Sequence, residues 1–292
     1  MASKNPVFDR LDKQIEKERY AGFNSSQSSQ NPQAASQGVT GGMAAQESMT
    51  AQQLNDMYSG TPAGPADTGR VTIDDVVMKS LSLFVVLLAA AGVSWFVSDG
   101  NPSLGYAFWL GGAIVGLGLG FAIAFMKKVS VPLIVLYAVV QGLFVGAFSQ
   151  FINNIQAYQG VVTMAVLATL CTFAAMYIGY ATGFVKVNSK TRRIFFFAVV
   201  GYAIFSVLQF VLLLTGVIDG WGFGGSGPLG IGLSILGTAL AAYSLAIDFD
   251  SIDHAVRVGA PQKYSWLLAH GLIVSVVWLY IEFVRLFARL RN

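Results

Sequence analysis

Long apolar stretches separated by short polar ones fill the chain from residue 80 onward. Each stretch is close to the ~20 apolar residues that cross a bilayer as an α-helix, the simplest structure that satisfies its own backbone polar groups in lipid. Seven stretches are long enough to span, at about 80–98, 104–126, 131–152, 159–184, 194–217, 229–248 and 265–288. The pattern predicts an all-α integral membrane protein, folded as a seven-transmembrane-helix bundle.

The first 70 residues have a different composition from the rest. They are rich in Ser, Gln, Ala, Gly and Pro and carry six basic and seven acidic residues. Such a segment cannot bury enough apolar surface to fold alone, so residues 1–70 are predicted to be a disordered polar tail before a membrane domain at 71–292. The spacing in Thr72-Ile-Asp-Asp75 is that of a capping box and predicts the start of a helix leading into the first span.

Composition supports a membrane protein and excludes several other classes. Of 292 residues, 54% are hydrophobic and only 11% charged, which a soluble domain of this length would struggle to cover with polar surface. The single cysteine, Cys171, excludes a disulfide framework and a cysteine metal site. The string Gly222–Gly227 fits a dinucleotide-binding pattern but follows no strand. No catalytic nucleophile stands out, so we expect no enzymatic activity, no catalytic residue, no resident cofactor and no nucleic-acid partner.

Basic residues alternate between the connections. The connections at 98–103, 153–158 and 218–228 contain no Lys or Arg, whereas the others and the approach to the first span do. This asymmetry predicts a multi-pass membrane protein with a cytoplasmic N-terminus. We expect it in the cell (plasma) membrane, the bacterial inner membrane. The last stretch leaves two alternatives, because Arg285, Arg289 and Arg291 would lie at the outer face: either they break the rule, or the segment turns back within the membrane.

Small residues recur every fourth position in two stretches, which predicts faces where helix backbones approach closely; a water path is the alternative. These residues are Gly112, Gly116 and Gly120 in the second stretch and Gly230, Ser234 and Thr238 in the sixth.

Acidic residues near or inside the apolar stretches are the candidate functional groups, because a carboxylate at membrane depth is costly and marks a site for an ion, a proton or a partner charge. Asp248 follows the uncharged run 241–247 and is predicted at the membrane edge or slightly inside. Asp250 is predicted to be solvated, with a supporting role as the alternative. Asp253 precedes Arg257 by four residues and is predicted to form a surface ion pair.

Glu282 lies within the last stretch and has two interpretations. Arg285 is three residues on, so the pair can be an intrahelical ion pair that hides the charge. Alternatively, Glu282 meets Asp248 inside the bundle. Two carboxylates brought together raise the pKa of at least one, and they can share a proton or bind a cation. Asp248 and Glu282 are therefore the candidate pH-gating residues and calcium ligands.

The hairpin between the last two stretches separates these acids in depth. A turn near 259–261 puts Asp248 about 12 residues before it and Glu282 about 22 after it, an offset of roughly 15 Å at ~1.5 Å per residue. His270 would then lie nearer to Asp248, either as a packed histidine or as a supporting group.

The order of these motifs resembles the Bax inhibitor-1/YccA-like family, also called the transmembrane Bax-inhibitor-motif family. The similarity covers about 72–290 and the short N-terminal motif. Two motifs resemble its actinobacterial branch, Asn5-Pro-Val-Phe8 and Thr72-Ile-Asp-Asp-Val-Val77. The family motifs are Asp248-Phe-Asp-Ser-Ile252 and Leu279-Tyr-Ile-Glu-Phe-Val-Arg-Leu-Phe287. The resemblance implies a seven-helix fold with the last helix central and a pH-sensitive calcium leak latched by two acids, here Asp248 and Glu282. The second acid is Glu, where the better-studied branch has Asp.

Three functions remain open at this point. The first is a passive cation pathway, with calcium as the preferred ion, gated by protonation of the membrane-embedded acids. The second is a non-conducting interaction protein that binds a membrane protease or another membrane complex, with the N-terminal tail as its contact. The third is a proton-coupled secondary transporter. The oligomeric state does not follow from the sequence.

Overall fold

The computed structural model describes residues 69–217 and 220–291 of the chain. The predicted tail therefore lies outside the described residues, apart from its last two. The predicted all-α fold is confirmed, since the described residues form seven helical spans that are long and apolar enough to cross a membrane. The spans are α3 (Ile73–Gly100), α4–η1–α5 (Pro102–Tyr106, Ala107–Gly111, Gly112–Phe125), α6 (Val131–Asn154), α7 (Val161–Ala181, preceded by the turn η2 at Gln156–Tyr158), α8 (Ser189–Leu214), α9 (Pro228–Arg257) and α10 (Tyr264–Arg291).

Two helices reach further than their apolar stretches. Helix α3 begins at Ile73, where the Thr72 hydroxyl accepts a hydrogen bond from the Asp75 amide at 3.1 Å, so the predicted helix start is confirmed. Helix α9 continues to Arg257, which places Asp248 inside a helix and not at its end. The reversal into α10 uses Gly259 with a φ of +66°, a conformation that favours glycine.

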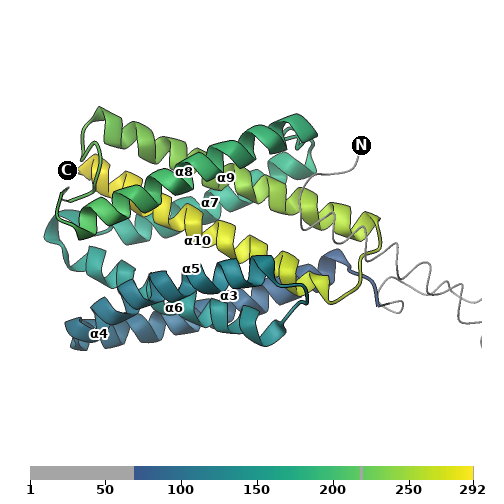
Figure 1. The fold of residues 1–292 in the computed structure, drawn as a ribbon, viewed down its shortest axis with the longest axis horizontal. Helices are drawn as coiled ribbons and strands as arrows, with labels where there is room; N and C mark the ends of the chain where they lie inside the picture. The colour runs from purple at the N-terminus through teal and green to yellow at the C-terminus, as the bar shows by residue number, and fades with distance from the viewer. Residues whose placement is uncertain (1–68, 218–219, 292) are drawn as a thin grey trace, which may run out of the picture. The chain divides into compact units, whose positions relative to one another are not determined.

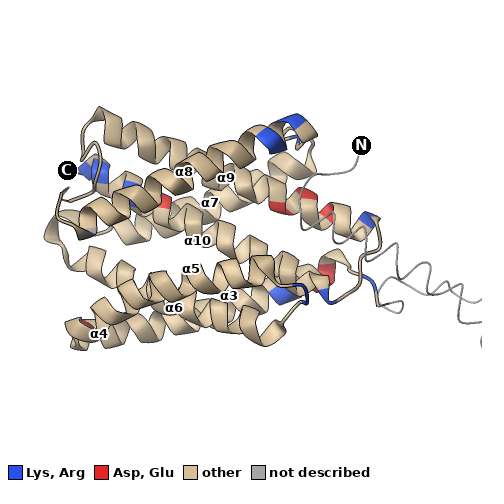
Figure 2. Cartoon of the chain, viewed as in Figure 1, with Lys and Arg blue, Asp and Glu red and all other residues tan. Residues whose placement is uncertain are grey.

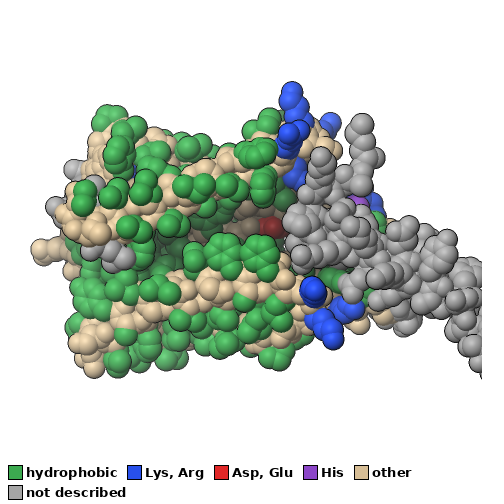
Figure 3. Space-filling view, viewed as in Figure 1, with side chains coloured by type: hydrophobic (Ala, Val, Ile, Leu, Met, Phe, Trp, Pro, Cys, Tyr) green, Lys and Arg blue, Asp and Glu red, His purple; other side chains and the backbone are tan. Residues whose placement is uncertain are grey.

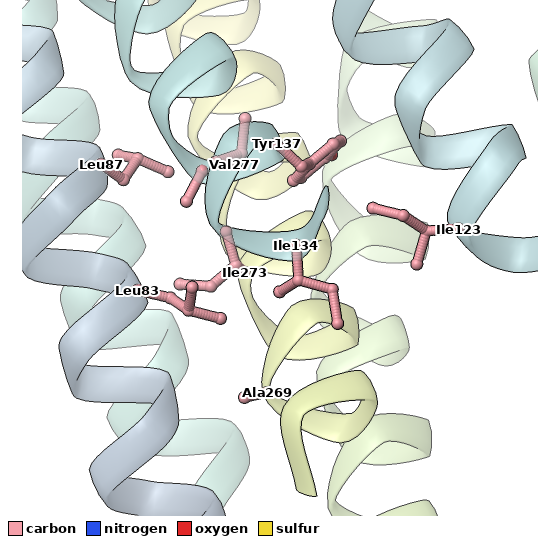
Figure 4. Packing of buried hydrophobic residues seen from close by; sticks show 9 residues of the cluster. Leu83, Leu87, Ile123, Ile134, Tyr137, Ala269, Ile273 and Val277 are labelled. Atoms are coloured by element: carbon pink, nitrogen blue, oxygen red, sulfur yellow. The ribbon is translucent and has the colours of Figure 1, made fainter. Parts of the chain in front are cut away.

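Helix α10 is the centre of the bundle. It packs against α3, α6, α7 and α9, and Figure 1 shows it, in yellow, running between the other helices. Its inner face meets α3, α5 and α6 in an apolar cluster, drawn in Figure 4. The labelled members of that cluster are Leu83, Leu87, Ile123, Ile134, Tyr137, Ala269, Ile273 and Val277. The expectation of a central last helix is confirmed.

Glycines bring α6 into backbone contact with α3. A Cβ built on Gly142 would lie 2.7 Å from the Ala90 Cβ, and one on Gly146 would lie 2.8 Å from the Ala91 Cα. The Ser94 hydroxyl adds a 2.7 Å hydrogen bond to the Leu143 carbonyl. Close packing and interhelical hydrogen bonds replace the hydrophobic driving force that lipid does not supply.

The glycine repeat of the second stretch also packs on α6. Cβ atoms built on Gly112 and Gly116 would lie 2.9 Å from the Phe144 Cβ and 2.6 Å from the Gln141 amide nitrogen. This confirms the predicted packing face.

The arginines at the end of α10 form hydrogen bonds within the protein. Helix α10 is one continuous helix of 28 residues, so the alternative in which the last segment turns back is wrong. Arg289 is buried and donates to the carbonyls of Trp221 and Gly230 and to the Ser234 hydroxyl. Arg291 donates to the Gln159 carbonyl. These contacts give Arg289 and Arg291 a structural role.

Helix α8 lies at the edge of the bundle. It packs against α9 and is the least buried of the seven spans. Polar contacts tie it to the rest, because Arg192 pairs with Asp250 on α9 and the Tyr202 hydroxyl bonds Glu282 on α10.

Candidate functional site

Asp248 lies between α9 and α10, away from the aqueous end of its helix. It precedes Arg257, the last residue of α9, by nine positions, which is about 14 Å of helix. Its Oδ1 would be 3.6 Å from a Cβ built on Gly271, so the absent side chain at Gly271 leaves room for the carboxyl group. Ser275, one turn further along α10, is also a neighbour. The other oxygen, Oδ2, is buried and has no hydrogen-bond partner among the described residues.

Glu282 is held by three donors from two helices. The Tyr202 hydroxyl of α8 lies 2.9 Å from both carboxylate oxygens, the Trp278 Nε1 is 3.1 Å from Oε1, and the Arg285 guanidinium is 3.4 Å from Oε1. Glu282 is only 1% exposed. The predicted intrahelical pair with Arg285 is thus confirmed, and Glu282 is a fully satisfied acid where Asp248 is not.

The structure does not bring Asp248 and Glu282 together. Glu282 of α10 faces Gly237 of α9, where a built Cβ would lie 2.6 Å from Oε2. Asp248 of α9 lies beside Gly271 of α10. Gly237 and Asp248 are eleven residues apart on α9, and Gly271 and Glu282 are eleven residues apart on α10. The two acids are therefore about 16 Å apart along the helix axes. The separation agrees with the depth offset expected from the hairpin. A calcium ion bridging the two carboxylates would require another conformation.

The neighbouring acids have partners at the surface. Asp253 pairs with Arg257 at 3.1 Å, and their side chains are 42% and 64% exposed, so the predicted surface pair is confirmed. Asp250 is only partly exposed and pairs with Arg192 of α8, with the Tyr180 hydroxyl 3.5 Å away. Asp250 therefore forms an interhelical ion pair and is not the solvated residue that the sequence predicted. These contacts tie α8 and α9 together at the end of the bundle.

His270 is a packed histidine. It is buried at 7% exposure, and its ring meets Tyr137 of α6 edge-on at 4.4 Å. Its Nδ1 has no hydrogen-bond partner among the described residues. His270 and Asp248 both lie near the first turns of α10, but no contact joins them in the described part of the chain. No group of three or more His, Cys, Asp or Glu side chains there is arranged to hold a metal ion.

Comparison with known proteins identifies the family to which the chain is related. A family model described as Bax inhibitor 1 like matches residues 5–292, nearly the whole chain. The chain belongs to the Bax inhibitor 1-like family. A search of curated proteins found no match to it. The matched region begins at Asn5, the first residue of the N-terminal motif, and includes all seven spans of the Bax inhibitor 1-like fold. The resemblance to the actinobacterial branch stays a prediction.

The sequence alone did not predict four residues of the candidate site in this family member. Tyr202 and Trp278 are typical apolar-span aromatics, and nothing in their spacing shows that they donate to Glu282. Gly237 and Gly271 matter through the space they leave beside an acid. A search for glycines opposite an in-membrane acid becomes possible only when the pairing of α9 and α10 is known.

Proposed function

We propose that this Bax inhibitor 1-like protein is a passive cation pathway across the plasma membrane, with calcium as the preferred ion and protonation of Asp248 as the gate. The observation that carries the proposal is the contrast between the two acids. Glu282 has three donors, whereas the Asp248 Oδ2 is buried without one. An under-satisfied carboxyl group within a span is suited to take up a proton or a cation, and carboxylate oxygens are the hard ligands that calcium prefers.

The proposal assigns different roles to the two acids. Asp248 exchanges the proton or ion, and Glu282 fixes the position of α8 against α10 through Tyr202. The acids are not in direct contact in this conformation: Asp248 belongs to α9 and lies beside Gly271 of α10, the helix that carries Glu282. No enzymatic step and no resident cofactor is part of the mechanism.

The orientation is part of the proposal. Figure 2 shows most Lys and Arg residues at the end of the bundle where α3 begins and α9 ends. The arginines at the other end, Arg285, Arg289 and Arg291, bind groups of the protein itself. In this proposal, the end with most of the basic residues faces the cytoplasm. Labelling of single cysteines placed at Lys128 and at Ser103 tests this, in a Cys171→Ser background: only Lys128→Cys should be protected from an impermeant reagent added outside.

Calcium flux into liposomes that hold the full-length protein tests the function. Wild type, Asp248→Asn and Glu282→Gln are compared from acidic to mildly alkaline pH. Asp253→Asn is the matched control, because it removes one carboxylate from the same helix at an exposed position. We expect pH-dependent flux in wild type and in the control, and loss of that dependence in Asp248→Asn.

Three outcomes would contradict the proposal. Unchanged pH dependence in Asp248→Asn would remove the assigned gate. Flux no greater than in empty liposomes at any pH would favour a membrane interaction protein, for instance a modulator of a membrane protease. Saturable uptake that depends on an added solute would instead identify a secondary transporter.

A further inference from the structure

A hollow opens in the side of the bundle between α5 and α8. Figure 3 shows it in the face where α10 lies between these two helices, with hydrophobic side chains along both sides. Helix α5 packs on α6 and η1, whereas α8 packs on α9, so the central helix is covered only in part between the two groups. The hollow faces the region of the lipid chains.

The floor of the hollow is a face of α10. Val274 is 36% exposed although it lies in the middle of the central helix. Gly271 and Trp278 lie one turn before and after it on the same face. This face is turned toward α8, because the Trp278 ring lies 6.2 Å from the Tyr202 ring.

The walls of the hollow belong to two strongly apolar helices. Phe121 and Phe125 of α5 are exposed, and their rings stack at 6.3 Å. Phe197 and Ile204 are among the exposed residues of α8. An apolar hollow of this kind favours a hydrocarbon chain, because an empty one forfeits the dispersion contacts of its lining.

Basic residues stand at one end of the hollow. In Figure 3, Lys and Arg side chains lie on both sides of its right-hand end. Lys127 and Lys128 lie two and three residues after the end of α5, and Lys190 and Arg193 lie near the start of α8. All four are exposed, and none forms an ion pair with another described residue.

We propose that this hollow binds one anionic phospholipid, with an acyl chain along Val274 and Trp278 and the phosphate between the basic residues at the ends of α5 and α8. Basic pockets between transmembrane helices are suited to anionic head groups on the cytoplasmic side. The carboxyl group of Asp248 lies beside Gly271 of the floor and disfavours a phosphate in the interior of the hollow. The rim is therefore the place for the phosphate. The inference does not require that the protein conducts ions.

Native mass spectrometry of the detergent-purified full chain tests the head-group site. Phosphatidylglycerol is titrated against phosphatidylcholine of the same chain length. We expect tighter binding of phosphatidylglycerol, and an affinity about 30-fold lower in Lys128→Gln/Arg193→Gln, from two basic residues near an anionic head group. The control Arg257→Gln/Lys263→Gln removes the same charge from exposed positions at the end of α9 and in the turn before α10. It should keep the affinity of wild type.

Quenching by bromine-labelled chains tests the acyl site independently. Brominated phosphatidylglycerol should quench Trp278, so the quenched fraction of fluorescence should fall in Trp278→Phe and in Val274→Phe, which fills the floor. Equal affinity for the two lipids, or an equal loss in the control variant, would overturn the head-group site. Quenching that is unchanged in both floor variants would overturn the acyl site.

Discussion

Replacing Gly146 with alanine tests how closely α3 and α6 must approach. The new Cβ would lie 2.8 Å from the Cα and the carbonyl carbon of Ala91, both backbone atoms that no rotamer change can move. Optimal carbon–carbon contacts are about 3.5–4.0 Å, so the two helices must separate by roughly 1 Å. Because this contact is made along the most extensive helix pair of the bundle, the displacement affects its neighbours as well.

The expected loss is the difference of two opposing effects. A glycine-to-alanine change inside a helix stabilises by about 1 kcal/mol, whereas overpacking costs about 1–3 kcal/mol and more where backbone is the obstacle. We expect a net loss of about 2 kcal/mol, which lowers Tm by roughly 4–8 °C in a domain of this size.

The matched control is Gly92→Ala on α3, since a Cβ at Gly92 meets nothing within 4 Å. Thermal unfolding in detergent, followed by near-ultraviolet circular dichroism, is the assay. Gly92→Ala should unfold at or above the wild-type temperature, and Gly146→Ala below it. Equal or higher Tm for Gly146→Ala would refute the argument that backbone contact fixes the α3–α6 distance.

Three further predictions concern buried or interhelical polar groups, and each is measured by the same unfolding assay. Tyr202→Phe removes the donor shared by both Glu282 oxygens and should destabilise by about 1–3 kcal/mol; effects that add fully with those of Glu282→Gln would count against a direct bond. Arg289→Met should destabilise by about 2 kcal/mol, and Arg289→Lys should rescue little, because a single ammonium cannot reach two carbonyls as the guanidinium does. The Arg192–Asp250 pair, each side chain 23% exposed, should contribute at most about 1 kcal/mol in a double-mutant cycle and less in high salt; a coupling that salt leaves unchanged would show that the pair is not screened.

The fold was largely predictable because its signal is local. A run of apolar residues predicts a span wherever it occurs, and the Gly112–Gly116–Gly120 repeat predicts a packing face without knowledge of its partner. The backbone contacts at Gly142 and Gly146 were missed, although these two glycines have the same four-residue spacing, because a single pair of small residues does not show which helix lies against it.

The candidate site was only partly predictable because it depends on pairing between helices. Asp248, Glu282 and the Glu282–Arg285 pair follow from one-dimensional spacing. The donors from Tyr202 and the room left by Gly237 depend on which face of α8 and α9 is turned toward α10. The offset of the two acids was predictable from the hairpin, since it follows from residue counting along two antiparallel helices.

The burial of Arg289 has a consequence for how the protein is made. Basic residues retard the translocation of a segment's end, and in the proposed orientation α10 carries three of them at the end that crosses. The carbonyls of Trp221 and Gly230, which receive the Arg289 guanidinium, belong to the loop before α9 and to its first turn. They are therefore synthesised before α10 and are available when it arrives. In that orientation, we expect tertiary docking and not the charge bias of α10 to decide the topology of the last helix, so a substitution that disrupts this loop should produce molecules with an inverted or uninserted C-terminus.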